Sequence, residues 1–260
     1  MKAAFELWKY RRTLFATAWS DIRGKYRGTF LGMGWSILYP IVFLILYAVV
    51  YLFIFKIRLP NYTPFEYILL IFSGLIPFLG FSESLSTGVG SVLANRGLIR
   101  NTMFPIELVP VKAVLASSVT MIVGLSILLP ILWLRGTILP SQALIPLLLV
   151  LQLVFTIGLI WLLSALNVFF QDIGQMTGVM ILFLMLVSPI AYTQDMIPAA
   201  LMPLMYPNPL FYMIMLYRDT IILGEIPLDL LGIFTLISLT TFFSGYYVFN
   251  RLKSLFADYV

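Results

Sequence analysis

Residues 94–107 form a short polar connector between two long apolar runs, and they read Ala94-Asn95-Arg96-Gly97-Leu98-Ile99-Arg100-Asn101-Thr102-Met103-Phe104-Pro105-Ile106-Glu107. The connector is long enough for roughly three helical turns but too short to fold as a domain. Ile99 and Met103 are spaced to share one edge of a helix, and Pro105 ends the segment because proline lacks a backbone N–H. We therefore interpret the connector as an amphipathic docking segment for a separate cytosolic protein.

The composition of the chain is that of a membrane protein. Hydrophobic residues occupy 61% of the 260 positions and charged residues 10%, and the mean hydropathy is +1.02, whereas soluble domains average about 25% charged residues. The apolar runs leave too few residues for a soluble module, so we expect a single transmembrane domain over residues 1–260. The absence of cysteine and histidine from the sequence excludes disulfides, thiol nucleophiles and the commonest zinc ligands.

The first 30 residues predict a helix that lies in the membrane interface. They contain seven of the sixteen Lys and Arg residues, and their aromatic and apolar side chains follow helical spacings: Phe5, Trp8, Phe15, Trp19, Ile22 and Tyr26. Gly24, Gly28 and Gly32 then recur every four residues, which permits either close helix packing or an elbow into the first span, and we favour the elbow. The net charge of +5 indicates contact with anionic lipids rather than with nucleic acid.

We predict an all-α, polytopic fold with six transmembrane helices, over residues 33–55, 65–93, 113–134, 143–170, 177–192 and 230–249. Residues 37–55 contain no charge, which suits the roughly 20 residues that a bilayer demands. Six spans place both termini in the cytosol and most Lys and Arg residues on the inner side, as the positive-inside rule requires.

Residues 196–224 predict an outer gate rather than a seventh span. Residues 196–217 carry no charge, but four prolines divide them into pieces of one or two turns: Pro198, Pro203, Pro207 and Pro209. Broken helices persist at membrane depth only where protein or a cavity covers them. We therefore expect two short re-entrant helices here, on the outer side of the membrane.

The first span carries an unusual aromatic ladder with intervals of four residues: Trp35, Tyr39, Phe43, Tyr47, Tyr51 and Phe55. Each interval advances the ring by about 40° around the helix, so three or four consecutive rings share a face. One interpretation is helix packing with aromatic belts at both interfaces. The other is a lane of flat, partly polar faces for a ligand with CH and OH groups, such as a sugar.

Other chemistry is largely absent from the sequence. No phosphate-binding loop occurs, since Gly24-Lys25 lacks both the following Ser or Thr and the earlier glycine. Glu83 is an acid at membrane depth among hydroxyl side chains, which suits either an ion-coupled function or a structural role. The carboxylates that a sugar-transferring enzyme would need are divided, because the expected topology separates Asp172 from Asp195, Asp219 and Glu225.

Taken together, the sequence resembles the membrane subunits of polysaccharide-exporting ATP-binding-cassette transporters, the family that moves O-antigen, capsule and teichoic acid chains. The matching stretches extend along the whole chain: Tyr26-Arg27-Gly28-Thr29-Phe30-Leu31-Gly32 with Trp35, Gly74-Leu75-Ile76-Pro77, Asn95 with Leu98-Ile99-Arg100 and Phe104-Pro105, Ser188-Pro189-Ile190 with Tyr192, and Asn208-Pro209 with Tyr217-Arg218-Asp219 and Gly224. Two positions depart from the family pattern. Phe78 replaces a common Trp, and Gln171 stands where Arg often precedes Asp172.

The resemblance implies a homodimer in the bacterial cytoplasmic (inner) membrane, with two copies of a cytosolic nucleotide-binding ATPase that binds ATP and Mg. It implies a non-enzymatic chain without a cofactor of its own, and a lipid-linked polysaccharide as cargo. Residues 94–107 would be the cytosolic coupling helix, with ATPase docking through Asn95, Arg96, Leu98, Ile99, Arg100, Met103 and Phe104. The outer gate would comprise Pro198, Pro203, Pro207, Asn208 and Pro209.

In this family setting, the ladder residues Trp35, Tyr39, Phe43, Tyr47 and Tyr51 are expected to line the substrate channel. Arg23, Lys25 and Arg27 are expected either to hold the pyrophosphate of a lipid carrier or to contact ordinary headgroups. Three rival functions remain at this point: a drug or lipid exporter of the same superfamily, an ion-coupled lipid-linked sugar flippase, and a membrane-embedded sugar-transferring enzyme.

Overall fold

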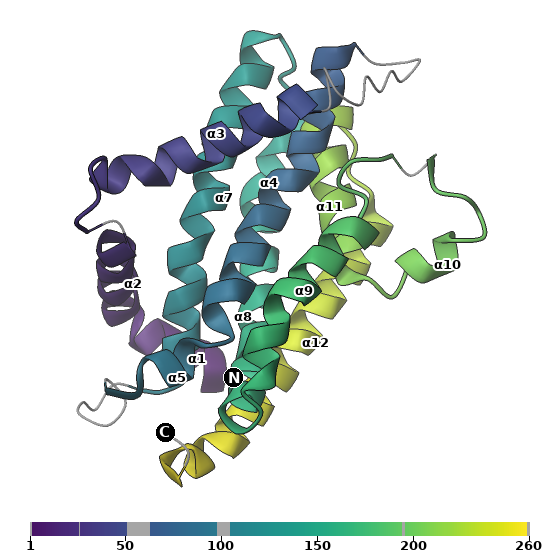
Figure 1. The fold of residues 1–260 in the computed structure, drawn as a ribbon. Helices are drawn as coiled ribbons and strands as arrows, with labels where there is room; N and C mark the ends of the chain where they lie inside the picture. Colours follow the sequence, from purple (N-terminus) through teal and green to yellow (C-terminus); the bar gives the residue numbers. More distant parts are fainter. Residues whose placement is uncertain (1, 26, 51–62, 98–104, 194–195, 259–260) are drawn as a thin grey trace.

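The computed structural model describes residues 2–25, 27–50, 63–97, 105–193 and 196–258, and within these ranges the chain is helical without a β-strand (Figure 1). The α-helices are α1 Lys2–Lys9, α2 Arg11–Lys25, α3 Trp35–Val49, α4 Pro64–Gly88, α5 Ser91–Ala94, α7 Leu108–Leu134, α8 Ile145–Phe169, α9 Asp172–Val187, α10 Met202–Met205, α11 Pro209–Arg218 and α12 Leu228–Leu252. Short 3₁₀ turns are η1 Gly32–Gly34, η3 Pro140–Leu144 and η6 Lys253–Asp258, and η5 Asp219–Leu223 is a π turn. The all-α fold class is confirmed.

Five helical segments are long and apolar enough to cross a bilayer: Gly32–Val49, Pro64–Gly88, Leu108–Leu134, Pro140–Phe169 and Leu228–Phe256. The fifth predicted span corresponds to α9, which is apolar but shorter. It ends at Val187 because Pro189 follows Ser188, and the residue before a proline avoids helical dihedrals. The six-span topology remains a prediction.

Two further spans differ in their boundaries from the expectation. The second predicted span is interrupted after Gly88, and the chain resumes as the short helix α5. The third was placed from Ala113, but α7 begins at Leu108 and contains the buried Lys112. The charge of Lys112 suggested that the span begins after it. The ion pair of Lys112 with Asp21 allows it to lie inside the helix.

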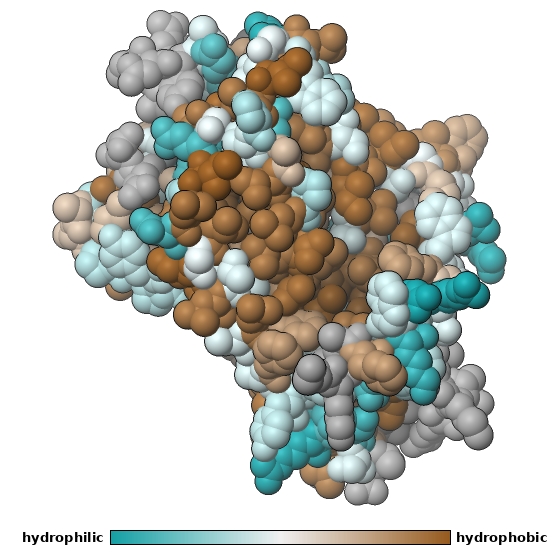
Figure 2. Space-filling view, turned by 180° about the vertical axis from the view of Figure 1, so that it is seen from behind, coloured by the Kyte–Doolittle hydropathy of each residue, from teal (hydrophilic) through white to brown (hydrophobic). Residues whose placement is uncertain are grey.

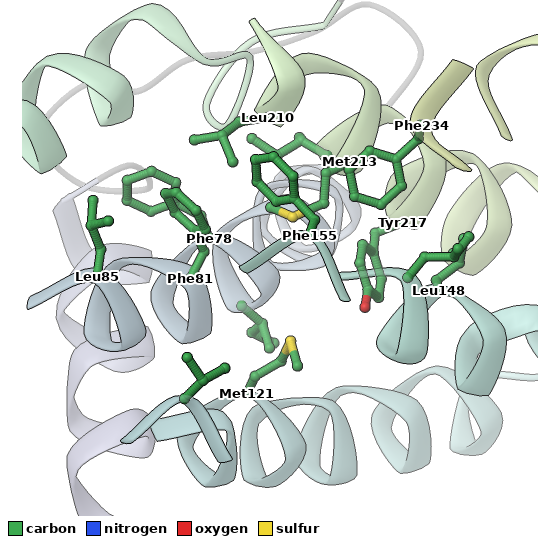
Figure 3. Packing of buried hydrophobic residues seen from close by; sticks show 14 of the residues in the cluster. Phe78, Phe81, Leu85, Met121, Leu148, Phe155, Leu210, Met213, Tyr217 and Phe234 are labelled. Atoms are coloured by element: carbon green, nitrogen blue, oxygen red, sulfur yellow. The ribbon is translucent and has the colours of Figure 1, made fainter. Parts of the chain in front are cut away.

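The helices α4, α7, α8, α11 and α12 enclose the core, and α3 crosses α4 and α7 obliquely (Figure 1). Aromatic rings from three helices meet at its centre, since Phe155 lies 5.9 Å from Phe81 and 6.0 Å from Phe234 between ring centroids (Figure 3). Helices α8 and α12 pack closely because of Gly158, where an added Cβ would lie 2.5 Å from the backbone nitrogen of Phe242.

One face of the molecule is largely apolar (Figure 2). A broad apolar surface covers the middle of the bundle, with polar side chains toward its two ends (Figure 2). Helices α1 and α5 and the C-terminal turn lie at one end of the bundle, whereas α2 and α10 lie on its opposite sides (Figure 1). At the elbow after α2, Gly28 and Gly32 adopt φ values of +81° and +50°, which favour glycine. Apart from its chain neighbours, no heavy atom of the described residues lies within 4 Å of a Cβ built on Gly24, Gly28 or Gly32, so these glycines are not packed against another described helix.

Candidate functional site

A cavity of about 550 Å³ lies between the end of α2, the start of α3, the C-terminal half of α4, and α7 and α9. Its lining combines one cation, one carboxylate, two aromatic rings and several hydroxyl groups, among them Lys25, Trp35, Tyr39, Ser82, Glu83 and Thr120. An adjoining cavity of about 310 Å³ shares Lys25, Glu83 and Thr120 with the first and extends to Asn95 and Lys112. We refer to the first as the inner cavity and to the second as the connector cavity.

An ion pair between Lys25 and Glu83 lines both cavities. Lys25 Nζ donates to Glu83 Oε1, and Thr120 Oγ1 donates to Glu83 Oε2. The Lys25 side chain is 51% exposed and that of Glu83 is 19% exposed, so the pair faces the cavity rather than the core. Lys25 is the last residue of α2, where the negative end of the helix dipole favours a cation. Glu83 is therefore held by Lys25 on α2 and by Thr120 on α7.

The aromatic ladder continues from the inner cavity along α3. The ring centroids of Tyr39 and Phe43 lie 6.3 Å apart, and those of Phe43 and Tyr47 lie 5.8 Å apart in a stacked arrangement. Trp35 and Tyr39 are 39% and 54% exposed, whereas Phe43 and Tyr47 are half-buried and pack partly against the core. The ladder is thus exposed at Trp35 and Tyr39, which line the cavity, and partly packed against the core further along α3. Its role as a substrate lane remains a prediction. Tyr51 lies outside the described residues.

The three predicted phosphate contacts do not converge. Lys25 lines the inner cavity, but the Arg23 guanidinium lies over the ring of Trp19 at 5.2 Å, and Arg27 is exposed beyond the end of α2. The helical geometry explains the separation of the first two, since residues two apart point about 200° from one another. Among the described residues that line the inner cavity, Lys25 is the one cation.

The start of the connector is attached to the N-terminal helices through Lys112. Lys112 Nζ lies 3.0 Å from Asp21 Oδ2 on α2 and donates to Asn95 Oδ1 over 3.0 Å. Asn95 also donates from Nδ2 to the carbonyl oxygen of Ser91 over 2.8 Å. The Lys112 side chain is only 7% exposed, so these oxygens compensate for the burial of its charge.

The end of the connector is attached to the C-terminal part of the chain. Glu107 Oε1 lies 3.3 Å from Lys253 Nζ, and its carbonyl oxygen accepts a 2.8 Å hydrogen bond from Trp161 Nε1. Trp161 is fully buried, and its ring lies 5.1 Å from that of Phe242 and 5.2 Å from that of Tyr246. Of the predicted docking residues, Asn95 is half-buried and Arg96 is exposed. The others lie outside the described residues, namely Leu98, Ile99, Arg100, Met103 and Phe104.

The predicted outer gate is anchored by a buried arginine that the sequence did not single out as a site. Arg218 is 2% exposed, and its guanidinium donates to the carbonyl oxygens of Pro189 at 2.7 Å, Tyr192 at 2.9 Å and Ile190 at 3.0 Å. Asn208 caps α11 by accepting from the Leu210 N–H at 3.0 Å and donates to Ser188 Oγ over 3.0 Å. These bonds attach α11 to the segment that follows α9.

The prolines of the predicted gate have different positions. Pro198, Pro203 and Pro207 are exposed, whereas Pro209 is half-buried at the first turn of α11. Helix α11 is buried along its whole length except for Pro209. The exposed prolines and α10 therefore form the outer part of this segment, and α11 forms part of the core.

Asp219 follows Arg218 and is 7% exposed. Burial raises the pKa of its carboxyl group to about 6, the positive charge of Arg218 opposes this increase, and the negative charge of Glu225 adds to it. Its Oδ1 atom has no hydrogen-bond partner in the described part of the chain. Within the described ranges, no group of three or more carboxylate side chains could hold a metal ion.

Comparison with known proteins identifies the family of this chain. The family model described as ABC-2 type transporter matches residues 12–222. The O-antigen export system permease protein RfbA of Klebsiella pneumoniae is 30% identical over 92% of this chain and 91% of its own length. RfbA of Myxococcus xanthus is 26% identical over 72% and 70%, and the polysialic acid transport protein KpsM of Escherichia coli is 26% identical over 92% and 93%. The resemblance noted from the sequence is confirmed, and the chain belongs to the ABC-2 type transporter family.

Proposed function

We propose that this chain is the channel-forming permease subunit of an ATP-driven exporter that moves a lipid-linked polysaccharide across the cytoplasmic membrane. The observation that carries the proposal is the inner cavity, where Lys25 lies beside the exposed rings of Trp35 and Tyr39. A cation suits the phosphate of a carrier lipid, and aromatic faces suit the CH faces of sugar rings. Relatives named for O-antigen export and polysialic acid transport support the same class of cargo.

The need for such a lane follows from the chemistry of a sugar polymer. Each hydroxyl group that enters hydrocarbon without a hydrogen bond costs roughly 2–7 kcal/mol, so the polymer requires a continuous polar or aromatic path. Tyr39, Phe43 and Tyr47 present successive rings along α3, and a chain of sugars can exchange weak stacking contacts from one ring to the next. Two copies of this chain, facing one another across such a path, provide more room than one helix bundle. We therefore include a homodimer in the proposal.

The energy source in this proposal is a separate ATPase that docks on the connector. The start of the connector leads through Lys112 to α2, and its end leads through Glu107 to α8 and the C-terminal turn. A force applied by a docked ATPase would thus reach the helix that carries Lys25 as well as the core. In this arrangement the termini and the connector face the cytosol.

Deletion of the gene in its native host tests the proposal. We expect the surface polysaccharide to disappear and its lipid-linked form to accumulate inside the cell, with both restored by a plasmid copy. The same phenotype is expected when the ATPase partner is made inactive in hydrolysis. Normal amounts of surface polysaccharide in the deletion strain would contradict the proposal, as would export that depends on the proton gradient but not on ATP.

A further inference from the structure

We propose that Glu83 occupies the place of the substrate's phosphate when the inner cavity is empty, and that an anionic carrier headgroup binds by displacing Glu83 from Lys25. This inference rests on the proposed function and extends it to the way in which the substrate enters. The ligand is a lipid with a phosphate or diphosphate headgroup, and its first sugar would lie beside Trp35 and Tyr39. In this proposal, Glu83 is the group that competes with the substrate for Lys25.

The geometry supports an exchange rather than a fixed structural contact. Lys25 is the cation among the described lining residues of the inner cavity, and its partner Glu83 lines the same cavity. The Lys25 side chain remains 51% exposed while paired, so a ligand that enters the cavity can approach the ammonium group without unfolding α2. The hydroxyl groups of Ser82 and Ser86 and the rings of Trp35 and Tyr39 border the remaining space.

The charges make the exchange favourable. A pair between a half-exposed ammonium group and one carboxylate contributes little stability, because water screens both groups. A diphosphate carries more negative charge and more acceptor oxygens than a carboxylate, so it is the stronger partner for Lys25. After displacement, Glu83 keeps the hydrogen bond from Thr120, which holds the carboxylate on the α7 side of the cavity.

The exchange also changes how α2 is attached to the bundle. Two ion pairs join α2 to the bundle: Lys25–Glu83 joins it to α4, and Asp21–Lys112 joins it to α7. Displacement of Glu83 removes the first attachment and leaves the second, which is next to Asn95 at the start of the connector. Substrate binding would thus break the ion pair that joins α2 to α4 beside the inner cavity.

Binding of geranylgeranyl diphosphate to the purified full-length chain in nanodiscs tests the exchange. We expect Glu83→Gln to tighten binding by about two- to fivefold, the factor that corresponds to the loss of a weak competing ion pair. We expect Lys25→Gln to weaken binding by about tenfold or more. Glu66→Gln, on the other end of α4, and Lys9→Gln, on α1, are matched controls, and both should bind as the unsubstituted chain does.

Several outcomes distinguish this mechanism from others. Weaker binding in Glu83→Gln would overturn the exchange, since it would make Glu83 a residue that positions Lys25. Equal binding of uncharged geranylgeraniol would overturn the role of the anion, and equal competition by phosphatidylglycerol vesicles would assign the site to ordinary membrane lipid. If the unsubstituted chain fails to bind the diphosphate, the exchange is wrong, and the export phenotype of the deletion strain shows separately whether the proposed function survives. Retained elution volume and α-helical circular dichroism show that each variant is folded.

Discussion

Arg218 Nη2 donates a 2.7 Å hydrogen bond to the carbonyl oxygen of Pro189, and thereby joins the end of helix α11 to the break that follows α9. The same guanidinium serves the carbonyl oxygens of Ile190 and Tyr192. A proline-containing break leaves carbonyl groups without helical partners, and at membrane depth these groups need donors from the protein. The planar fork of an arginine satisfies several of them at once.

We expect Arg218→Lys to destabilise the folded chain by about 1–3 kcal/mol, because a single ammonium group cannot reach all three carbonyl oxygens and an unsatisfied buried acceptor carries a cost of this size. The measurement is thermal unfolding of the purified chain in detergent. Arg251→Lys is the matched control, since Arg251 is exposed on α12. An unchanged melting temperature in Arg218→Lys would show that the outer segment does not depend on this residue.

Asp219 should make the stability of the chain depend on pH. Its folded pKa of about 6 lies above the ordinary value of 3.8, so the folded state binds the proton more tightly than the unfolded state does. This contribution is present at low pH and is lost as the pH rises through 6. Asp219→Asn should therefore raise the melting temperature at pH 7.5, and the gain should shrink at pH 5. A gain that is equal at both pH values would contradict the argument.

The double substitution of Tyr39 and Phe43 by Ala tests the aromatic lane. We expect surface polysaccharide to fall at least about tenfold while co-purification with the ATPase partner is retained, because stacking contacts along α3 are removed without a change at the connector. Tyr247→Ala removes an exposed ring from α12 and serves as the control. Normal export by the double variant would exclude the ladder as the path of the polymer.

Lys112→Met tests the attachment of the connector to α2. Methionine preserves most of the side-chain volume but removes the ammonium group that contacts both Asp21 and Asn95. We expect the complex to hydrolyse ATP at a near-normal rate while export falls several-fold, so that more ATP is used per polymer moved. The assay is ATPase activity and transport in the same proteoliposomes. A parallel loss of both activities would instead indicate a general defect in assembly.

Much of the fold follows from local patterns in the sequence. The apolar runs around α4, α7, α8 and α12 are long enough to be recognised by hydropathy, and the four prolines of residues 196–217 indicated short helices there. The interval of four residues predicted that the rings of Tyr39, Phe43 and Tyr47 would follow one another along α3. These features depend on neighbours within one or two helical turns.

The remaining features depend on contacts between distant segments. We expected Lys112 to lie outside the third span. Its partner Asp21 is 91 residues away in the sequence, so the ion pair that allows Lys112 to lie within α7 could not be recognised from local spacing. Arg218 was noted within a family motif, but the carbonyl groups that it serves belong to a segment without regular structure. Arg23, Lys25 and Arg27 were grouped on the family resemblance, but Arg23 and Lys25 point in different directions on α2, and Arg27 lies beyond its end. Glu83 was left between two roles, since neither Lys25 nor Thr120 could be assigned to it from spacing.

The central claim is that this chain provides a passage and that a separate ATPase provides the energy. Its most direct test is transport of fluorescently labelled lipid-linked polysaccharide into proteoliposomes that contain this chain alone, the ATPase alone, or both. Our account predicts transport only when both proteins and hydrolysable ATP are present, and none with an ATPase that cannot hydrolyse ATP. Transport at an equal rate by this chain alone would contradict the account.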